Sequence, residues 1–237
     1  MPSVFVICAD CHIRAGESFK IEAITHIIEG LSRGEVLVIA GDFCDALVGK
    51  SELLWDWQKE LLDIFRKAFA EGKRVIYVEG NRDFFLEYFK GKYFVDVQKE
   101  YCCLHEGSVV VVHGDLINRK DWKYRWWRGL VKSKLVFRAA TRLIPDTWLI
   151  RIIFWLEKRM RALNQRFKDH IPLAMIRDFV AGIVPKPLIV VSGHFHSFIQ
   201  ESVNGILFIS LPSWDEYPNV LRVMLDKESI LYKLESL

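Results

Sequence analysis

Residues 36–42 read VLVIAGD, an apolar run that leads directly into Gly41 and Asp42. An uninterrupted apolar run of this length, rich in β-branched side chains, predicts a strand that is buried on both faces of its sheet. In open α/β sheets, the loops at the carboxyl ends of the strands form the ligand crevice. The glycine lets the backbone turn tightly at that edge. We therefore expect the carboxylate of Asp42 to lie at a ligand site.

The same arrangement, an apolar strand followed at once by polar residues, recurs along the chain. A strand predicted at Val4–Ala9 leads into Asp10-Cys11-His12, and one at Val75–Val78 leads into Gly80-Asn81-Arg82-Asp83. A strand predicted at Val109–Val112 leads into His113-Gly114-Asp115, and one at Leu188–Val191 leads into Gly193-His194-Phe195-His196. Apolar spacing predicts helices at Phe19–Leu31 and Glu52–Ala70, and later strands at Ile206–Ser210, Val220–Leu225 and Ile230–Leu234. Strands that alternate with helices, followed by a strand-rich end, predict an α/β fold: a four-layered α/β/β/α sandwich.

The length of 237 residues and a hydrophobic fraction of 51 % fit one domain that spans residues 1–237. Residues 116–182 interrupt the pattern, because they carry no strand signal and are helical in composition. The segment also holds Trp122, Trp126, Trp127, Trp148 and Trp155. We expect it to be a helical cap, inserted within the domain over the mouth of the site.

The net charge of +3 conceals an uneven distribution, since lysine and arginine far outnumber acidic residues between Asn118 and Lys168. These cations either form an ordinary solvated helical face or belong to a cap that rests on an anionic membrane surface. Lysine and arginine interleaved with tryptophan suit such a bilayer surface. Long apolar runs lie among them and no base-reading motif is present, so we expect no nucleic-acid partner.

The cysteine count indicates a cellular compartment. Five cysteines, an odd number without a recognisable secretory signal, indicate a reducing cytosol rather than a disulfide framework. The longest apolar run in the basic segment, Trp148 to Leu156, is interrupted by Arg151 and falls short of the roughly 20 residues of a membrane span. We expect a cytoplasmic protein.

The polar residues at the strand ends have the chemistry of metal ligands. They comprise two carboxylates, one amide and four imidazoles: Asp10, Asp42, Asn81, His12, His113, His194 and His196. This set is too large for one catalytic zinc ion, which takes three protein ligands and a water. It suits two divalent ions that share a carboxylate. Mixed nitrogen and oxygen ligands without thiolate favour manganese, iron or zinc over magnesium or calcium, and we expect Mn²⁺.

In this order, D-x-H, G-D, G-N-x-D, H-G-D and G-H-x-H resemble the signature of the calcineurin-like metallophosphoesterases, and the resemblance extends from Phe5 to His196. It implies a dinuclear metal site. By this resemblance one ion is held by Asp10, His12, Asp42 and His196. The other is held by Asp42, Asn81, His113 and His194, with Asp42 as the bridge.

One position departs from the wider family, in which a histidine of the G-N-H-D motif protonates the leaving oxygen. Here the residue is Arg82, which stays charged and is no general acid at neutral pH. Either the chain is a non-catalytic scaffold, or its leaving group needs no proton. A phosphate leaving group has a second pKa of about 6, and arginine holds phosphate oxygens bidentately. The intact ligand set favours hydrolysis of a pyrophosphate bond.

The run G-N-R-D-F, Gly80 to Phe84, is similar to the motif of the UDP-2,3-diacylglucosamine diphosphatases of lipid A biosynthesis. This resemblance implies hydrolysis of a lipid-linked nucleotide, UDP-2,3-diacylglucosamine, to UMP and 2,3-diacylglucosamine 1-phosphate. It implies a peripheral location on the inner face of the inner membrane. Another nucleotide or phospholipid pyrophosphatase or phosphodiesterase remains an alternative.

The same resemblance implies roles for individual residues. It gives catalytic roles to Asp42, Asn81 and Arg82, and substrate contacts to Asn81, Arg82, Asp121, Tyr124, Asn164, Lys168 and His194. The chain differs from this subfamily after the second histidine of the last motif, where Ser197-Phe198 replaces a basic residue and proline, and between the histidines, where Phe195 replaces threonine.

Overall fold

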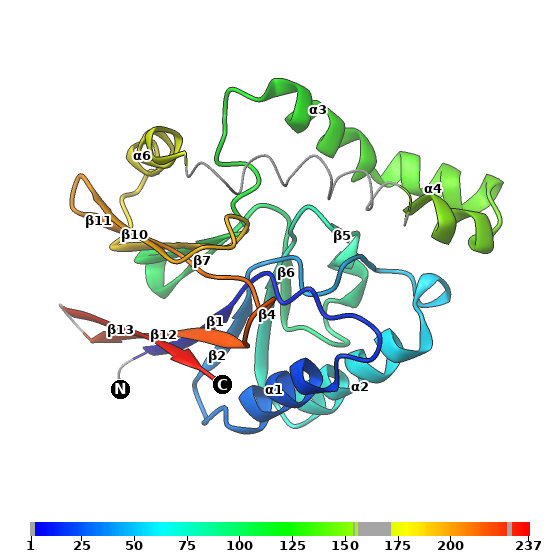
Figure 1. Cartoon of the computed structure of the whole chain (residues 1–237), viewed down its shortest axis with the longest axis horizontal. Coiled ribbons are helices and arrows are strands. Elements are labelled where there is room, and N and C mark those ends of the chain that lie inside the picture. The colour runs from blue at the N-terminus through cyan, green and yellow to red at the C-terminus, as the bar shows by residue number, and fades with distance from the viewer. Residues whose placement is uncertain (1–2, 154, 156–171, 227–228) are drawn as a thin grey trace.

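Two stacked sheets form the centre of the computed structural model, which describes residues 3–153, 155, 172–226 and 229–237 (Figure 1). The first sheet has the order β13-β12-β1-β2-β4-β6. Its strands are β1 (Ser3–Cys8), β2 (Val36–Ile39), β4 (Arg74–Val78), β6 (Asp96–Gln98), β12 (Asn219–Asp226) and β13 (Ser229–Ser236). Strands β1, β2, β4 and β6 run parallel, so their carboxyl ends meet at one edge.

The second sheet has the order β10-β11-β9-β8-β7. Its strands are β7 (Tyr101–Leu104), β8 (Val109–Val112), β9 (Ile189–Ser192), β10 (Ile199–Val203) and β11 (Ile206–Ser210). Strands β8, β9 and β11 are parallel, whereas β7 and β10 are antiparallel to their neighbours. A short parallel pair, β3 (Leu47–Val48) and β5 (Asp83–Phe84), joins the loops that follow β2 and β4.

Helices cover the outer faces of both sheets, which confirms the α/β sandwich. Helices α1 (Ser18–Glu29) and α2 (Asp56–Ala70) pack on the first sheet, and α6 (Leu173–Ala181) packs on the second (Figure 1). Between the sheets, apolar residues of β1, β2, β4 and β12 meet those of β7, β8, β9 and β11. Every residue of β2 is buried, as the run VLVI predicts.

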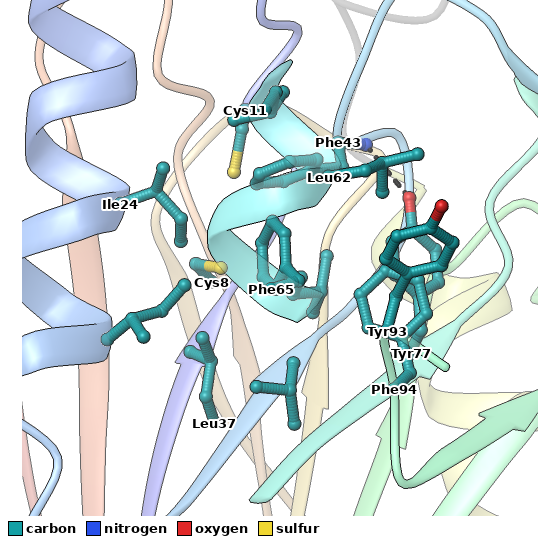
Figure 2. Close-up of a cluster of buried hydrophobic side chains, with 14 of the residues drawn as sticks. Cys8, Cys11, Ile24, Leu37, Phe43, Leu62, Phe65, Tyr77, Tyr93 and Phe94 are labelled. Carbon is teal, nitrogen blue, oxygen red and sulfur yellow. Dashed lines mark hydrogen bonds between the residues drawn. The ribbon is translucent and has the colours of Figure 1, made fainter. Parts of the chain in front are cut away.

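The core beneath α1 and α2 also explains three of the cysteines. Cys8, Cys11 and Cys44 are fully buried and belong to the apolar cluster of this layer. Figure 2 shows Cys8 and Cys11 among Ile24, Leu37 and Phe65. All five cysteines are free. The four buried ones fill space in the core as small apolar side chains do, whereas Cys103 is exposed.

The segment predicted as a cap is helical in its described part. Helices α3 (Trp122–Val131) and α4 (Lys134–Leu143) contain no buried residue, and residues 146–153 are also helical. Leu149 is buried against Val48 and Leu53, which ties this segment to the loop after β2. Among the described residues, no helix is both long and apolar enough to cross a bilayer.

Several elements differ from the sequence-based expectation. The helix expected from Glu52 begins at Asp56, because a separate 3-10 turn at Ser51–Leu53 precedes it. Strands β6, β7 and β10 were not predicted. They are only three to five residues long and carry polar or exposed side chains, so they lack an apolar run.

Candidate metal centre

Five loops converge where the parallel strands of both sheets end. Backbone hydrogen bonds join them directly. Asp10 donates its N–H to Gly41 O across 3.1 Å, and His12 donates to Asp42 O at the same distance. On the other sheet, Gly193 donates to His113 O across 2.9 Å. Polar groups that are far apart in sequence therefore meet in one cluster of side chains.

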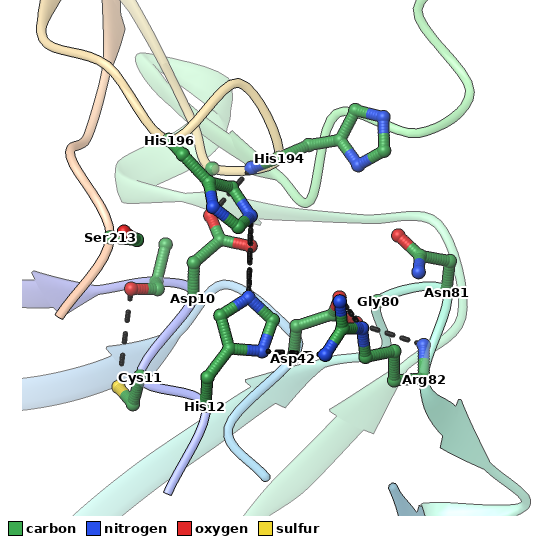
Figure 3. A network of polar contacts seen from close by, with 12 residues as sticks. Asp10, Cys11, His12, Asp42, Gly80, Asn81, Arg82, His194, His196 and Ser213 are labelled. Carbon is green, nitrogen blue, oxygen red and sulfur yellow. Dashed lines mark hydrogen bonds and ion pairs between the residues drawn. The ribbon is translucent and has the colours of Figure 1, made fainter. Parts of the chain in front are cut away.

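A first ligand group consists of Asp10, His12 and His196 (Figure 3). The Nε2 atoms of the two imidazoles lie 3.2 Å apart. Both face Oδ1 of Asp10, at 3.7 Å from His12 and 3.4 Å from His196. A carboxylate oxygen and two imidazole nitrogens that face one another form a donor set for a divalent transition metal ion.

A second group consists of Asp10, Asp42 and His113. His113 Nε2 lies 3.7 Å from Asp42 Oδ1 and 3.0 Å from Asn81 Oδ1, so the amide of Asn81 faces the same point. His113 Nδ1 donates to Ala40 O across 2.9 Å, which directs Nε2 toward the carboxylates. Asp10 belongs to both groups, and Asp42 lies in the second of them.

His194 lies beside these groups. Its imidazole points away from Asp10, His12 and His196 (Figure 3). Its ring centroid is 5.2 Å from that of His113. The backbone N–H of His194 donates to Asp10 Oδ2 across 2.6 Å, so the loop that carries His194 also orients an acidic ligand. The structure thus brings together all seven residues that the motifs indicated.

The backbone at these residues is strained. Asp10, His12, Asp42, His194 and His196 all have positive φ angles, between 46° and 70°. Residues other than glycine rarely adopt this left-handed region, and it costs free energy. Close packing holds the loops there, because a Cβ on Gly193 would stand 2.5 Å from Asp10 Oδ2.

Asp83 fixes two of these loops from beneath. Its Oδ2 accepts hydrogen bonds from the backbone N–H groups of Asp42 and Gly80, and its Oδ1 accepts one from the Tyr77 hydroxyl. Burial, reinforced by the negative charge of Asp42, raises the pKa of Asp83 to about 7. Asp83 is a positioning group and not a ligand.

The pKa values of the site's histidines are shifted in different directions, down for His12 and His194 and up for His113. Burial, together with Arg82, lowers the pKa of His12 well below its ordinary value, and burial with His113 lowers that of His194 to about 4. Neutral imidazole is the form that binds a metal. His113 behaves differently, since Asp42 and Asp10 outweigh its burial and raise its pKa.

These residues fit a pair of divalent ions. Asp10 is fully buried, and its Oδ1 has no hydrogen-bond donor among the described residues. A buried carboxylate oxygen without a donor is costly, and a cation between Asp10 and the facing imidazoles would satisfy it. The amide nitrogen of Asn81 is likewise without an acceptor among the described residues, as expected if its oxygen serves as the ligand.

Arg82 lies against this centre. Its Nε is 3.4 Å from Asp42 Oδ2 (Figure 3). Its NH1 donates to Asp45 Oδ1 across 2.9 Å. The same NH1 is 3.2 Å from His12 Nδ1. The carboxylate of Asp45 therefore holds the guanidinium at the edge of the ligand groups.

The substrate contacts expected from the resemblance are placed only in part. Asp121 accepts the N–H of Tyr124 at the start of α3, and the Tyr124 hydroxyl donates to Asp115 Oδ2 across 2.6 Å. Tyr124 thus reaches the loop of His113. Asn164 and Lys168 lie outside the described residues. Their roles stay predictions.

Sequence reasoning missed the groups that attach α3 to the site. Arg128 donates from Nε to Asp115 Oδ2 across 2.7 Å. Lys132 donates to Gly80 O across 2.7 Å and lies 3.3 Å from Glu79 Oε2. The only available signal was the basic composition of the segment, which does not identify the partners.

Comparison with known proteins agrees with this geometry. Residues 3–198 match the model of the calcineurin-like phosphoesterase family. A UDP-2,3-diacylglucosamine hydrolase of Ralstonia nicotianae is 30 % identical over 168 residues, which cover 67 % of this chain and 59 % of that protein. A protein of the same name from Neisseria gonorrhoeae is 24 % identical over 238 residues, with 94 % of each chain covered.

Among solved structures, a novel archaeal phosphodiesterase aligns with a TM-score of 0.51 and 14 % identity over 99 % of both chains. At that identity, the likeness supports the fold alone.

Proposed function

Because the chain belongs to the calcineurin-like phosphoesterase family, we propose that it is a two-metal hydrolase that cleaves a phosphoric anhydride. One ion would be held by Asp10, His12, Asp42 and His196, and the other by Asp42, Asn81, His113 and His194. Mn²⁺ is the first candidate, since the donors mix nitrogen and oxygen without thiolate. Bound divalent ions would lower the pKa of a water molecule and neutralise charge on the phosphoryl oxygens.

The position of Arg82 is the observation that supports an anhydride. Asp45 holds its guanidinium beside Asp42 and His12, where phosphoryl oxygens would lie if ions were bound by those ligands. An arginine there stabilises negative charge but donates no proton to a leaving group. A phosphate leaving group needs only stabilisation of its negative charge. The alkoxide of a simple diester needs a proton from a general acid.

The proposed substrate is UDP-2,3-diacylglucosamine, cleaved to UMP and 2,3-diacylglucosamine 1-phosphate. The names of the relatives and the run from Gly80 to Phe84 support this substrate class. In this assignment Asn81, Arg82 and His194 contact the phosphates, and Asp121, Tyr124, Asn164 and Lys168 contact the remainder of the substrate. Tyr124 supports the assignment best, because it reaches Asp115 beside the His113 loop.

We further propose that residues 116–182 form a cap within one domain and attach the enzyme to an anionic bilayer. Trp122 and Trp126 on α3 and Leu135 on α4 are each more than 60 % exposed. Exposed lysine and arginine residues, including Lys123 and Arg142, lie among them. Exposed tryptophan and leucine side chains surrounded by lysine and arginine are suited to binding the headgroup region of an anionic bilayer. Such binding would hold the enzyme peripherally on the inner face of the inner membrane, on the cytoplasmic side, near a lipid-linked substrate.

The decisive experiment is turnover by the Mn²⁺-loaded protein of UDP-2,3-diacylglucosamine, UDP-glucose and bis(p-nitrophenyl) phosphate. The proposal expects the diacylated substrate to be hydrolysed most efficiently. Preference for UDP-glucose would favour another nucleotide pyrophosphatase. Preference for the diester would favour a phosphodiesterase, and no turnover of any of them would favour a non-catalytic scaffold.

A further inference from the structure

A buried lysine of α1 contacts the loop that follows β1. Lys20, in the first turn of the helix, is only 1 % exposed. Its Nζ donates to the backbone oxygens of Cys11 and His12, across 3.1 Å and 3.4 Å. Lysine is rarely buried so completely unless its charge is paired, and here Glu17 Oε2 lies 3.2 Å from the ammonium. Lys20 therefore connects α1 to the loop that carries Asp10 and His12.

The backbone of His12 is held on both sides by these contacts. The peptide group between Cys11 and His12 donates its N–H to Asp42 O across 3.1 Å, and its oxygen accepts from Lys20. The next oxygen, that of His12 itself, accepts from the same ammonium. One group that binds two successive carbonyl oxygens restrains the two dihedral angles between them. The φ angle of His12 is 46°, a left-handed conformation that persists only where the surroundings fix it.

Glu17 fixes the ammonium in turn. Its Oε2 also accepts the backbone N–H of Arg14 across 2.9 Å, and its own N–H donates to Arg14 O across 3.2 Å. Glu17 directly precedes α1, so one carboxylate joins the turn at residues 14–17 to the start of the helix. The charge of Lys20 is thus neutralised by an acid whose position is itself set by backbone contacts.

The imidazole of His12 depends on this backbone for its direction. Its Nε2 lies 3.7 Å from Asp10 Oδ1 and 3.2 Å from His196 Nε2, so it faces the first ligand group. The direction in which a side chain leaves the backbone follows from φ and ψ. Relaxation of His12 to a common conformation would turn the imidazole away from these partners. Groups that orient a ligand affect metal affinity although they do not touch the ion.

We propose that Lys20 is a positioning residue of the metal centre, which holds His12 in its left-handed conformation and so directs the imidazole at one of the two ions. The inference rests on the proposed function for the presence of two ions and makes the role of α1 in it specific. The ion concerned, called the first ion below, is the one assigned to Asp10, His12, Asp42 and His196. Lys20 contacts none of the loops that carry Asn81, His113 and His194 among the described residues, so it should matter less to the other ion.

Stepwise binding of Mn²⁺ to the metal-depleted protein, followed by calorimetry and electron paramagnetic resonance, tests this role. Lys20→Met keeps the length of the side chain but removes the ammonium. It should weaken binding of the first ion by about 10- to 100-fold, as the loss of a group that orients a ligand does, and weaken binding of the other ion much less. His12→Ala, which removes the ligand itself, identifies the binding step of the first ion.

The resonance spectrum gives a second readout that does not depend on activity. At a Mn²⁺ concentration that fills both sites of the wild type, the signal of an exchange-coupled pair is expected. In Lys20→Met, this signal should give way to that of isolated Mn²⁺. A purely structural role of Lys20 would lower stability and leave the coupled signal of the folded protein in place.

Lys73→Met is the matched control. The Lys73 Nζ also donates to two successive backbone oxygens of α1, those of Ile28 at 2.8 Å and Glu29 at 3.1 Å, but at the opposite end of the helix. Both variants should lose stability in urea unfolding, whereas only Lys20→Met should change metal binding. If Lys20→Met does not fold, Lys20→Gln, which keeps a polar end group, should show the same selective loss of the first ion.

The outcomes separate this inference from the proposed function. Wild-type affinity for both ions in a folded Lys20→Met or Lys20→Gln protein, or equal weakening by Lys20→Met and Lys73→Met, would overturn the positioning role and leave the proposed function standing. A wild type that binds two Mn²⁺ ions and depends on Lys20 for the first, yet does not hydrolyse UDP-2,3-diacylglucosamine, would overturn the proposed function and leave the role of Lys20 standing.

Discussion

Arg128 on α3 forms a buried ion pair with Asp115, with Nε and Oδ2 2.7 Å apart and side-chain exposures of 10 % and 3 %. Asp115 follows the candidate ligand His113 by two residues, so this pair ties the first helix of the proposed cap to the metal centre. The guanidinium also donates to the backbone oxygens of Glu79 and Lys99. Helix α3 is therefore anchored through polar contacts, since none of its residues is buried as a whole.

Replacing Arg128 with methionine should destabilise the protein substantially. Removing one partner of a buried pair leaves an uncompensated charge, here on Asp115, at a cost of about 3–5 kcal/mol. Urea unfolding measures this loss. Arg125→Met, at an exposed position of the same helix, is the control and should change the free energy of unfolding by less than about 0.5 kcal/mol. Equal stability of the two variants would contradict the importance of the pair.

Asp42→Ala should abolish activity and lower the metal content of both sites. Asp42 faces His113, and its Oδ1 also accepts the backbone N–H of Arg82, so its loss disturbs two loops. Metal analysis of the purified protein is the measurement, with Asp63→Ala on the exposed face of α2 as the control. Two full equivalents of metal in the Asp42→Ala protein would refute its assignment as the bridge.

Metal removal should lower the melting temperature. The Asp10 and Asp42 carboxylates are buried together, and a bound cation offsets their repulsion. Mn²⁺ at about 100 times its Kd should add about 2.7 kcal/mol, or roughly 5–10 °C for a domain of this size. Differential scanning calorimetry after chelation and Mn²⁺ titration tests this. A melting temperature that does not respond to Mn²⁺ would argue against a metal centre.

Arg82→Ala should lose activity on an anhydride by roughly ten- to a hundredfold, because a hydrogen bond to a charged group contributes about 1.5–3 kcal/mol. Arg82→His should not restore the parent activity fully, since an imidazole lacks the planar fork of donors. The wild type should hydrolyse simple alkyl phosphodiesters only feebly. Steady-state kinetics of all three proteins is the measurement. If Arg82→Ala were as active as the wild type on the anhydride, Arg82 would have no role in catalysis.

Anionic vesicles should bind the protein at low salt and release it at high salt. Trp126→Ser should weaken cosedimentation, because Trp126 is 66 % exposed among basic residues of α3. Tyr101→Ser is the control, since Tyr101 is comparably exposed but lies on β7 of the second sheet. Absence of binding at low salt would instead indicate that the basic segment is an ordinary solvated face.

The sequence by itself determined the main strands and the residues at their ends. The run VLVIAGD predicts both β2 and the position of Asp42, because a buried parallel strand needs continuous apolar residues and its loop needs a glycine. The same local rule located Asp10, His113 and His196. The same rule did not predict strands β6 and β7, because a short edge strand is stabilised by pairing with its neighbour and not by the propensity of its own residues.

Only the tertiary structure decided which charged groups act on the site. Arg14 and Asp45 are 31 residues apart, and Lys132 and Gly80 are 52 apart, yet both pairs lie within hydrogen-bond distance. No local pattern specifies such partners, because a lysine or arginine has the same helical propensity and charge whichever carboxylate it meets. The partners are chosen when the strands pair and the loops close, which brings Asp45 between two arginines and places Arg128 over Asp115.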